Sequence, residues 1–146
     1  MKKLPVVEKF VSIQGEGDWV GTIMWFIRLG GCVVGEAGTP KGKGHGWDTC
    51  TLPSGYKFRC DTAYAANDNI SVDELIDWVP ERVHVCITGG EPSVYDLSEL
   101  INGLQKKGVQ IHIETSGVGE WQGWMVGCWI TMSPKQGYNP RLLEEE

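Results

Sequence analysis

Runs of alternating or continuous apolar residues predict five β-strands along the chain. The runs carry the β-branched and aromatic side chains that strands favour, and glycine-rich turns and two short helical patterns separate them. The predicted strands are Val6–Ile13, Thr22–Leu29, Val83–Thr88, Val109–Thr115 and Cys128–Met132.

Two segments carry the start signals and the apolar spacing of amphipathic helices. A capping box from Ser71 to Glu74 opens the first, and a proline ends it. A similar pattern from Asp96 to Glu99 predicts the cap of the second, and Gly108 predicts its end. The second helix presents one apolar face, formed by Leu97, Leu100, Ile101 and Leu104.

The order strand, helix, strand over residues 83–115 predicts two parallel strands joined by a right-handed crossover. The strand at 128–132 continues this arrangement along the sheet. We therefore expect an α/β fold with mostly parallel strands, in one domain that spans residues 1–146.

Small, polar and glycine-rich segments follow the predicted strands. Because the carboxyl ends of parallel strands meet at one edge of a sheet, these segments should share one rim, where ligands of such folds gather. The sequence thus predicts a ligand site built from residues 28–32, 88–92, 114–117 and 133–135.

Two of the predicted strands alternate polar with apolar residues. A parallel strand that is covered on both faces is usually apolar throughout. The alternation therefore predicts either a barrel-like interior with a wet or ligand-filled cavity, or a sheet face that is partly exposed. The polar positions are His84, Cys86 and Thr88 in one strand and Gln110, His112 and Glu114 in the next.

Composition excludes several classes of protein. The 146 residues carry a net charge of −6, so no basic field is available to hold a nucleic-acid backbone. No apolar run approaches the roughly 20 residues of a membrane-spanning helix, and the N-terminus lacks the apolar core of a signal peptide. Five cysteines cannot all pair with one another, and in a reducing compartment thiols more often serve metals or chemistry.

Six motifs together resemble the 7-carboxy-7-deazaguanine synthase (QueE) family of the radical SAM superfamily. They are SIQGEG (Ser12–Gly17), FIRLGGC (Phe26–Cys32), CDT (Cys60–Thr62), TGGEP (88–92), ETSG (114–117) and SPK (133–135). The resemblance implies that the fold is a shortened radical SAM partial (β/α) barrel. It also implies that the protein is cytoplasmic. It further implies the ring contraction of 6-carboxy-5,6,7,8-tetrahydropterin to 7-carboxy-7-deazaguanine, on the route to queuosine-type 7-deazapurines.

The resemblance implies three cofactors: a 4Fe–4S cluster, S-adenosyl-L-methionine and Mg2+. The candidate cluster ligands are Cys32, Cys50 and Cys60, and Thr62 matches the family threonine that contacts Mg2+. Seventeen residues separate the first two cysteines and nine the last two, so the chain departs from the compact three-cysteine loop of most superfamily members. A thiolate cluster remains sterically possible because both gaps are glycine-bearing loops. Lengthening a loop also costs little free energy, only about 0.6 kcal/mol per doubling.

The remaining site residues are also implied by the resemblance. Gly89, Gly90 and Glu91 would bind the methionine part of S-adenosyl-L-methionine, with the Glu91 carboxylate available to an ammonium group. The ribose and carboxylate side would fall to Ser116, Ser133 and Lys135. The pterin substrate would be held by Gln14, Glu16 and Arg28.

Other interpretations of the same residues stay open at this point. Cys32, His45, Cys50 and Cys60 could form a Cys3His zinc site, in a chain that binds a ligand or partner without turnover. A glycyl-radical-enzyme activase also carries TGGEP. Cys86 and Cys128 lie in predicted strands, where we expect them as small buried hydrophobic residues.

Two partners complete the expectations. The resemblance implies an electron donor such as flavodoxin. The family normally continues well beyond SPK, so the strand at 128–132 would lie at or near an open sheet edge. A homodimer could cover that edge, the C-terminal tail could fold back over it, or the chain could be a fragment that binds S-adenosyl-L-methionine but turns over poorly. Of these we expect the homodimer.

Overall fold

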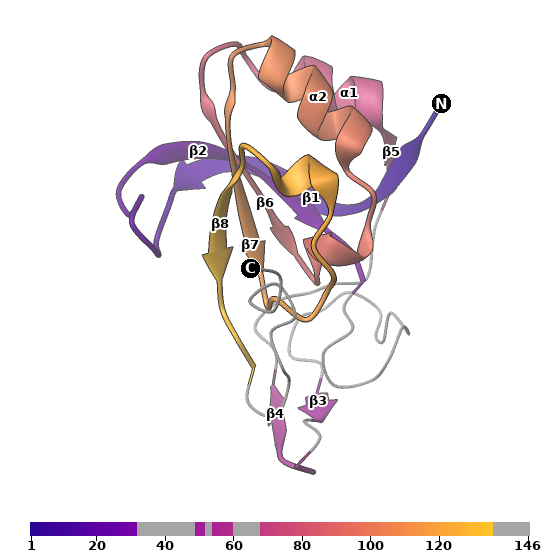
Figure 1. Cartoon of the computed structure of the whole chain (residues 1–146), viewed down its shortest axis with the longest axis vertical. Coiled ribbons are helices and arrows are strands. Elements are labelled where there is room, and N and C mark those ends of the chain that lie inside the picture. The colour runs from indigo at the N-terminus through magenta and orange to yellow at the C-terminus, as the bar shows by residue number, and fades with distance from the viewer. Residues whose placement is uncertain (32–48, 52–53, 60–67, 136–146) are drawn as a thin grey trace.

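The structure is a computed structural model, and it describes residues 1–31, 49–51, 54–59 and 68–135 (Figure 1). Helices and strands alternate through the second half of the chain. Among the described residues no helix is long and apolar enough to cross a membrane. The elements are β1 (Lys3–Ile13), β2 (Ile23–Leu29), β3 (Thr49–Thr51), β4 (Lys57–Arg59), β5 (Asp68–Ser71), α1 (Val72–Trp78), β6 (His84–Gly89), η1 (Pro92–Val94), α2 (Ser98–Lys106), β7 (Gln110–Thr115), η2 (Gly123–Met125) and β8 (Trp129–Met132).

Six strands form one open sheet in the order β5-β1-β2-β6-β7-β8. The pairs β2–β6, β6–β7 and β7–β8 are parallel, whereas β1 pairs antiparallel with both β2 and β5. The α/β class and the mostly parallel sheet are therefore confirmed, and within the described residues the sheet does not close into a barrel. A separate antiparallel pair, β3–β4, lies beyond the end toward which the arrows of β6 and β8 point (Figure 1).

All five predicted strands are present, with small shifts at their ends. The largest shift is in β1, which begins at Lys3 because residues 3–6 pair with β5. The strand β5 was not predicted, since its four residues, Asp-Asn-Ile-Ser, are mostly polar and carry no strand pattern. The short helices η1 and η2 were not predicted either, because a single 3-10 turn has no periodicity to detect.

The two helix starts differ in how well the sequence predicted them. The Ser71 hydroxyl accepts a hydrogen bond from the Glu74 amide at 3.2 Å, so the N-terminal cap of α1 is confirmed. The capping box predicted for α2 is wrong in register. The Asp96 carboxylate instead accepts from the amide and hydroxyl of Ser98, two residues ahead, and the helix begins there. Aspartate commonly forms this local turn, which competes with a cap three residues on.

The two faces of the sheet have different partners. One face packs on α1 and α2, which lie together on that side of the sheet (Figure 1), and forms the main core. The predicted apolar face of α2 is buried there. Trp124 and Met125 of η2 join the same core, a role that the loop pattern around them did not indicate. The main core residues contributed by the central strands are Ile27, Leu29, Val85, Ile87, Ile111 and Ile113.

The backbone at the end of β6 approaches the end of β2 very closely. Gly89 has a φ of +134°, which side-chain-bearing residues rarely adopt. A Cβ at this position would lie 2.2 Å from the Leu29 carbonyl oxygen. Only glycine therefore lets these two strand ends meet.

Replacing Gly89 by alanine should consequently destabilise the fold. We expect Gly89→Ala to lower the free energy of unfolding by about 2–4 kcal/mol, because backbone strain and a backbone clash add. Urea denaturation measures the change. The control is Gly123→Ala, where a Cβ meets nothing within 4 Å; equal stability of the two variants would contradict the close approach.

Candidate functional site

The face of the sheet opposite the helices carries a row of polar side chains near the carboxyl ends of the strands. Cross-strand pairing places Glu8 beside Arg28, Arg28 beside Thr88, and Glu114 beside Thr131. Because Ile87 pairs with Ile113, the same register brings Thr88 next to Glu114. This polar row, formed by Glu8, Arg28, Thr88, Glu114 and Thr131, crosses five adjacent strands.

A second row lies one step further from the carboxyl ends and is largely aromatic. Its members in strand order are Phe10, Phe26, Cys86, His112 and Trp129. The first two rings stack with their centroids 5.1 Å apart, and the thiol and imidazole are almost fully buried. The alternating pattern of β6 and β7 is thus explained by the two faces of the sheet. The apolar positions face the main core, and the other positions form the aromatic and polar rows of the opposite face.

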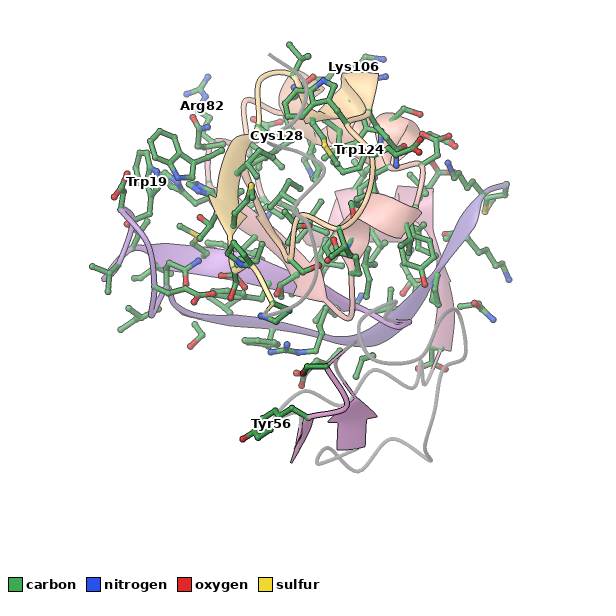
Figure 2. All side chains as sticks on the ribbon, turned by 60° about the horizontal axis from the view of Figure 1, so that its bottom comes forward. Trp19, Tyr56, Arg82, Lys106, Trp124 and Cys128 are labelled. Carbon is green, nitrogen blue, oxygen red and sulfur yellow. The ribbon has the colours of Figure 1, made fainter. Side chains whose placement is uncertain are left out.

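Trp19 covers this aromatic row from the turn between β1 and β2 (Figure 2). Its ring centroid lies 5.1 Å from those of His84 and His112 and 5.7 Å from that of Trp129. The two imidazoles also contact each other, with Nδ1 of His84 2.9 Å from Nε2 of His112. The ring contacts of Trp19 anchor the turn that carries Gln14 and Glu16 onto the sheet.

Gln14 is buried and connects that turn to the polar row. Its side-chain amide donates to a Glu114 carboxylate oxygen at 2.9 Å, and its carbonyl accepts from the amides of Gly15 and Glu16. Two residues that are distant in sequence therefore present an amide and a carboxylate side by side. Glu114 falls within the predicted rim segment 114–117, but no role in the site was predicted for its side chain.

Arg28 is partly buried in the polar row. Its Nε donates to a Glu8 carboxylate oxygen at 2.8 Å, and its guanidinium lies 6.0 Å from the Phe10 ring centroid. Its terminal nitrogens make no hydrogen bond to a described residue. A planar guanidinium can donate two parallel hydrogen bonds to an anion. Glu8 was likewise not predicted as a site residue.

Hydrogen bonds join the rim segments that follow β2 and β6. The Gly90 amide donates to the Leu29 carbonyl, and the Glu91 amide donates to the Gly31 carbonyl. The Tyr95 hydroxyl donates to the carbonyl of Gly30 at 2.6 Å. The predicted meeting of these glycine-rich segments at one rim is confirmed by these contacts.

The rim segments after β7 and β8 join the same edge. Ser116 contacts the Glu91 carboxylate through its amide and its hydroxyl. The Ser133 amide donates to the Thr115 carbonyl at 2.8 Å, and Lys135 folds back so that its Nζ donates to the Ser133 hydroxyl at 3.0 Å. The predicted cofactor residues therefore share one edge, at which Ser133 and Lys135 form the β8 side.

The predicted metal ligands lie mostly outside the described residues. This holds for Cys32, Cys60 and Thr62, and of Cys50 only the backbone, in β3, is described. Within the described part of the chain, no group of three or more histidine, cysteine, aspartate or glutamate side chains is arranged to hold a metal.

The two described cysteines are free thiols. Cys86 is fully buried, as expected, and burial, together with the nearby Glu114 charge, raises its pKa above the ordinary range. Cys128 lies just before β8 and is only half-buried, so the expectation of full burial is wrong for it. Burial raises its pKa to about 11. Both thiols stay protonated near neutral pH, and a protonated thiol is a poor metal ligand.

Comparison with known proteins gives a consistent set of relatives, although no family model matches the chain. The chain is 32% identical over 146 residues to a 7-carboxy-7-deazaguanine synthase of Flavobacterium psychrophilum. It is 36% identical over 133 residues to one of Synechocystis sp.. These alignments cover 94% and 90% of the chain but only 57% and 55% of the relatives, so the chain spans a little over half of their length.

A solved structure gives the same result in three dimensions. The crystal structure of QueE from Escherichia coli superposes with a TM-score of 0.66 at 31% sequence identity. The superposition covers 97% of this chain and 67% of that one. The shared fold therefore includes the sheet and the rim described above.

The buried imidazole in the aromatic row predicts a pH-dependent stability. Burial and the neighbouring His84 charge lower the pKa of His112 to about 4, against the opposing effect of Glu114. The unfolded chain therefore binds a proton near pH 6.5 that the folded chain binds only near pH 4. The stabilisation is complete above pH 6.5 and is lost as the pH falls toward 4.

We expect this loss to reach about 2–3 kcal/mol at pH ~4, on the basis of 1.36 kcal/mol per pKa unit. Urea unfolding of the wild type and of His112→Gln at a series of pH values measures it. The variant should lose much of the slope between pH ~6.5 and ~4, because glutamine does not titrate. An unchanged slope would show that other groups cause the acid sensitivity.

Proposed function

The chain belongs to the 7-carboxy-7-deazaguanine synthase (QueE) family, and we propose that it acts as a radical SAM lyase on 6-carboxy-5,6,7,8-tetrahydropterin. The product would be 7-carboxy-7-deazaguanine, a precursor of queuosine-type 7-deazapurines. The observation that carries the proposal is the position of the polar row. The row lies in the strands, next to the glycine-rich rim segments that follow them. A substrate on the row would therefore face a cofactor on the rim.

The chemistry of the polar row fits the substrate. The Gln14 amide and the Glu114 carboxylate lie 2.9 Å apart, and together they can read the donors and acceptors of an aminopyrimidinone edge. Arg28 can hold the substrate carboxylate with its terminal nitrogens, while Glu8 orients the guanidinium. Glu16, whose amide is bound to the Gln14 carbonyl, would contact the pterin from the turn.

The backbone and side-chain groups of the rim are of the kinds that could bind S-adenosyl-L-methionine. Glycine backbone at Gly89 and Gly90 permits close approach of a ligand. The Ser116 and Ser133 hydroxyls and the Lys135 ammonium match the ribose and the carboxylate of the cofactor. When bound, a 4Fe–4S cluster with S-adenosyl-L-methionine supplies one-electron chemistry, and the chain supplies orientation and exclusion of water. We propose Cys32, Cys50 and Cys60 as the cluster ligands and Thr62 as a ligand of Mg2+.

The partners and the compartment follow from the same proposal. Reduction of the cluster needs an electron donor such as flavodoxin, and retention of its thiolates needs a reducing compartment such as the cytoplasm. The two described cysteines are unpaired, which is consistent with such a compartment.

The proposal predicts an iron-dependent activity. After anaerobic purification and reduction, the chain should bind about four irons and convert the tetrahydropterin to 7-carboxy-7-deazaguanine, detected by mass spectrometry. Cys32→Ala, Cys50→Ala and Cys60→Ala should each abolish the cluster. The matched controls Cys86→Ala and Cys128→Ala should retain it and cost about 1 kcal/mol in packing.

Three other results would contradict this assignment in different ways. A colourless protein that contains zinc would support the Cys3His site. If Cys50→Ala kept a full cluster, Cys50 would not be a ligand, and His45 or an external group would take its place in the ligand set. Cleavage of S-adenosyl-L-methionine without product would favour another radical enzyme, such as an activase.

Arg28 provides a test of substrate handling. Arg28→Lys keeps the charge but loses the planar fork, so we expect about a tenfold higher KM for the tetrahydropterin. Uncoupled cleavage of S-adenosyl-L-methionine should be unchanged. Arg82→Lys is the matched control, because Arg82 is exposed and precedes β6 at the other end of the strand (Figure 2). Equal loss of coupled and uncoupled cleavage in Arg28→Lys would assign the residue to the cofactor or the fold.

We further propose that a second copy of the chain covers the β8 edge of the sheet. This strand is last in the sheet order, and Trp129 on it is 40% exposed. Light scattering over a range of protein concentrations should give the mass of a dimer. A monomer with full turnover at every concentration would contradict this arrangement.

A further inference from the structure

The Glu91 carboxylate is fully buried at the rim and is surrounded by donors from the chain itself. Oε1 accepts from the Ser93 amide at 3.1 Å, from the Ser93 hydroxyl at 2.7 Å and from the Thr115 hydroxyl. Oε2 accepts from the Ser116 amide at 2.8 Å and from the Ser116 hydroxyl. Five donors therefore converge on one side chain.

These donors use the full capacity of the carboxylate. An ionised carboxylate offers about four lone-pair sites, and a buried one needs them filled because burial of an unpaired charge is costly. A ligand ammonium could bind here only by displacing serine or threonine donors that are themselves buried. The geometry therefore favours a bond network internal to the protein.

The network joins three strand ends. The Glu91 side chain reaches η1 through Ser93 and the end of β7 through Thr115 and Ser116. Its own amide donates to the Gly31 carbonyl beyond β2. The Thr115 hydroxyl in turn accepts from the Gly117 amide at 3.1 Å, so the turn after β7 is held as well.

We propose that Glu91 is a positioning residue. Its hydrogen bonds to Ser93, Thr115 and Ser116, here called the clasp, hold the rim segments together and position Ser116 and the glycine backbone. The clasp itself rests only on these contacts. Its effect on S-adenosyl-L-methionine rests on the proposed function. On this view, the ammonium of the cofactor is not received by the Glu91 carboxylate, in contrast to the role that the sequence resemblance implies.

Binding of two ligands separates a positioning role from direct contact. The probes are S-adenosyl-L-homocysteine and its analogue with hydrogen in place of the amino group, titrated calorimetrically into the full, anaerobically reconstituted chain. In Glu91→Gln, the amide nitrogen would direct hydrogens at groups that are themselves donors, so the clasp should open. We expect both ligands to weaken by the same factor, about tenfold or more.

A second variant leaves the Glu91 carboxylate in place. Thr115→Val removes one donor with little change in shape, and it should also weaken both ligands equally. Glu99→Gln, an exposed position in the first turn of α2, is the matched control and should change neither affinity. If Glu91→Gln weakens only the ligand that carries the amino group, Glu91 contacts the ammonium and the proposal is overturned.

Amide hydrogen exchange tests the clasp without any ligand. The Ser93 and Ser116 amides donate to Glu91, so both should exchange about tenfold faster or more in Glu91→Gln. The Ile101 amide, which donates to Leu97 within α2, should be unaffected. Unchanged exchange at Ser116 would overturn the clasp. If the wild type binds neither probe but this exchange pattern holds, the clasp stands and the cofactor part of the proposed function fails.

Discussion

One buried carboxylate connects the parts of the rim on which the candidate site depends. Parallel strands bring loops from distant parts of the sequence to one edge, but hydrogen bonds within the sheet end where the strands end. Glu91 continues the connection beyond that point, because its two oxygens bind donors from η1 and from the end of β7. The Gly90 and Glu91 amides donate to the carbonyls of Leu29 and Gly31, at and just beyond the end of β2. The rim thus keeps a defined shape without regular secondary structure.

The two sides of the sheet divide stability from chemistry. The side covered by α1 and α2 is mostly apolar and supplies the main core. The opposite side carries the polar row near the carboxyl ends of the strands and the aromatic row next to it. The polar side chains therefore have packed aromatic neighbours. Trp19 contributes to both packing and the candidate site. It covers the aromatic row, and it anchors the turn that carries Gln14. A substrate held by the polar row would therefore meet groups with little freedom to move.

The comparisons extend this description to a family. The relatives named 7-carboxy-7-deazaguanine synthase share about a third of their aligned residues with the chain, which spans a little over half of their length. The shared segment contains the strands and the rim that carry the motifs. The superposed part of this chain thus includes both the polar row and the glycine-rich rim.

Sequence patterns alone predicted five of the eight described strands, the cap of α1, the buried face of α2 and the meeting of glycine-rich segments at one rim. These features depend on local chemistry or on periodicity, which a single chain displays. The patterns failed at Asp96, where two local hydrogen-bonding patterns compete, and at β5, whose pairing partner lies more than sixty residues away.

Which side chains of the candidate site meet could be read only from the folded chain. The motifs assigned substrate contacts to Gln14 and Arg28, but not to Glu114 and Glu8, which lie beside them. In the same way, TGGEP indicated Glu91 as a ligand-binding residue, whereas the fold surrounds its carboxylate with five protein donors. Sequence identifies a group that can accept hydrogen bonds. The partner that reaches it depends on strand register and loop path, because residues distant in the chain become neighbours only when the sheet forms.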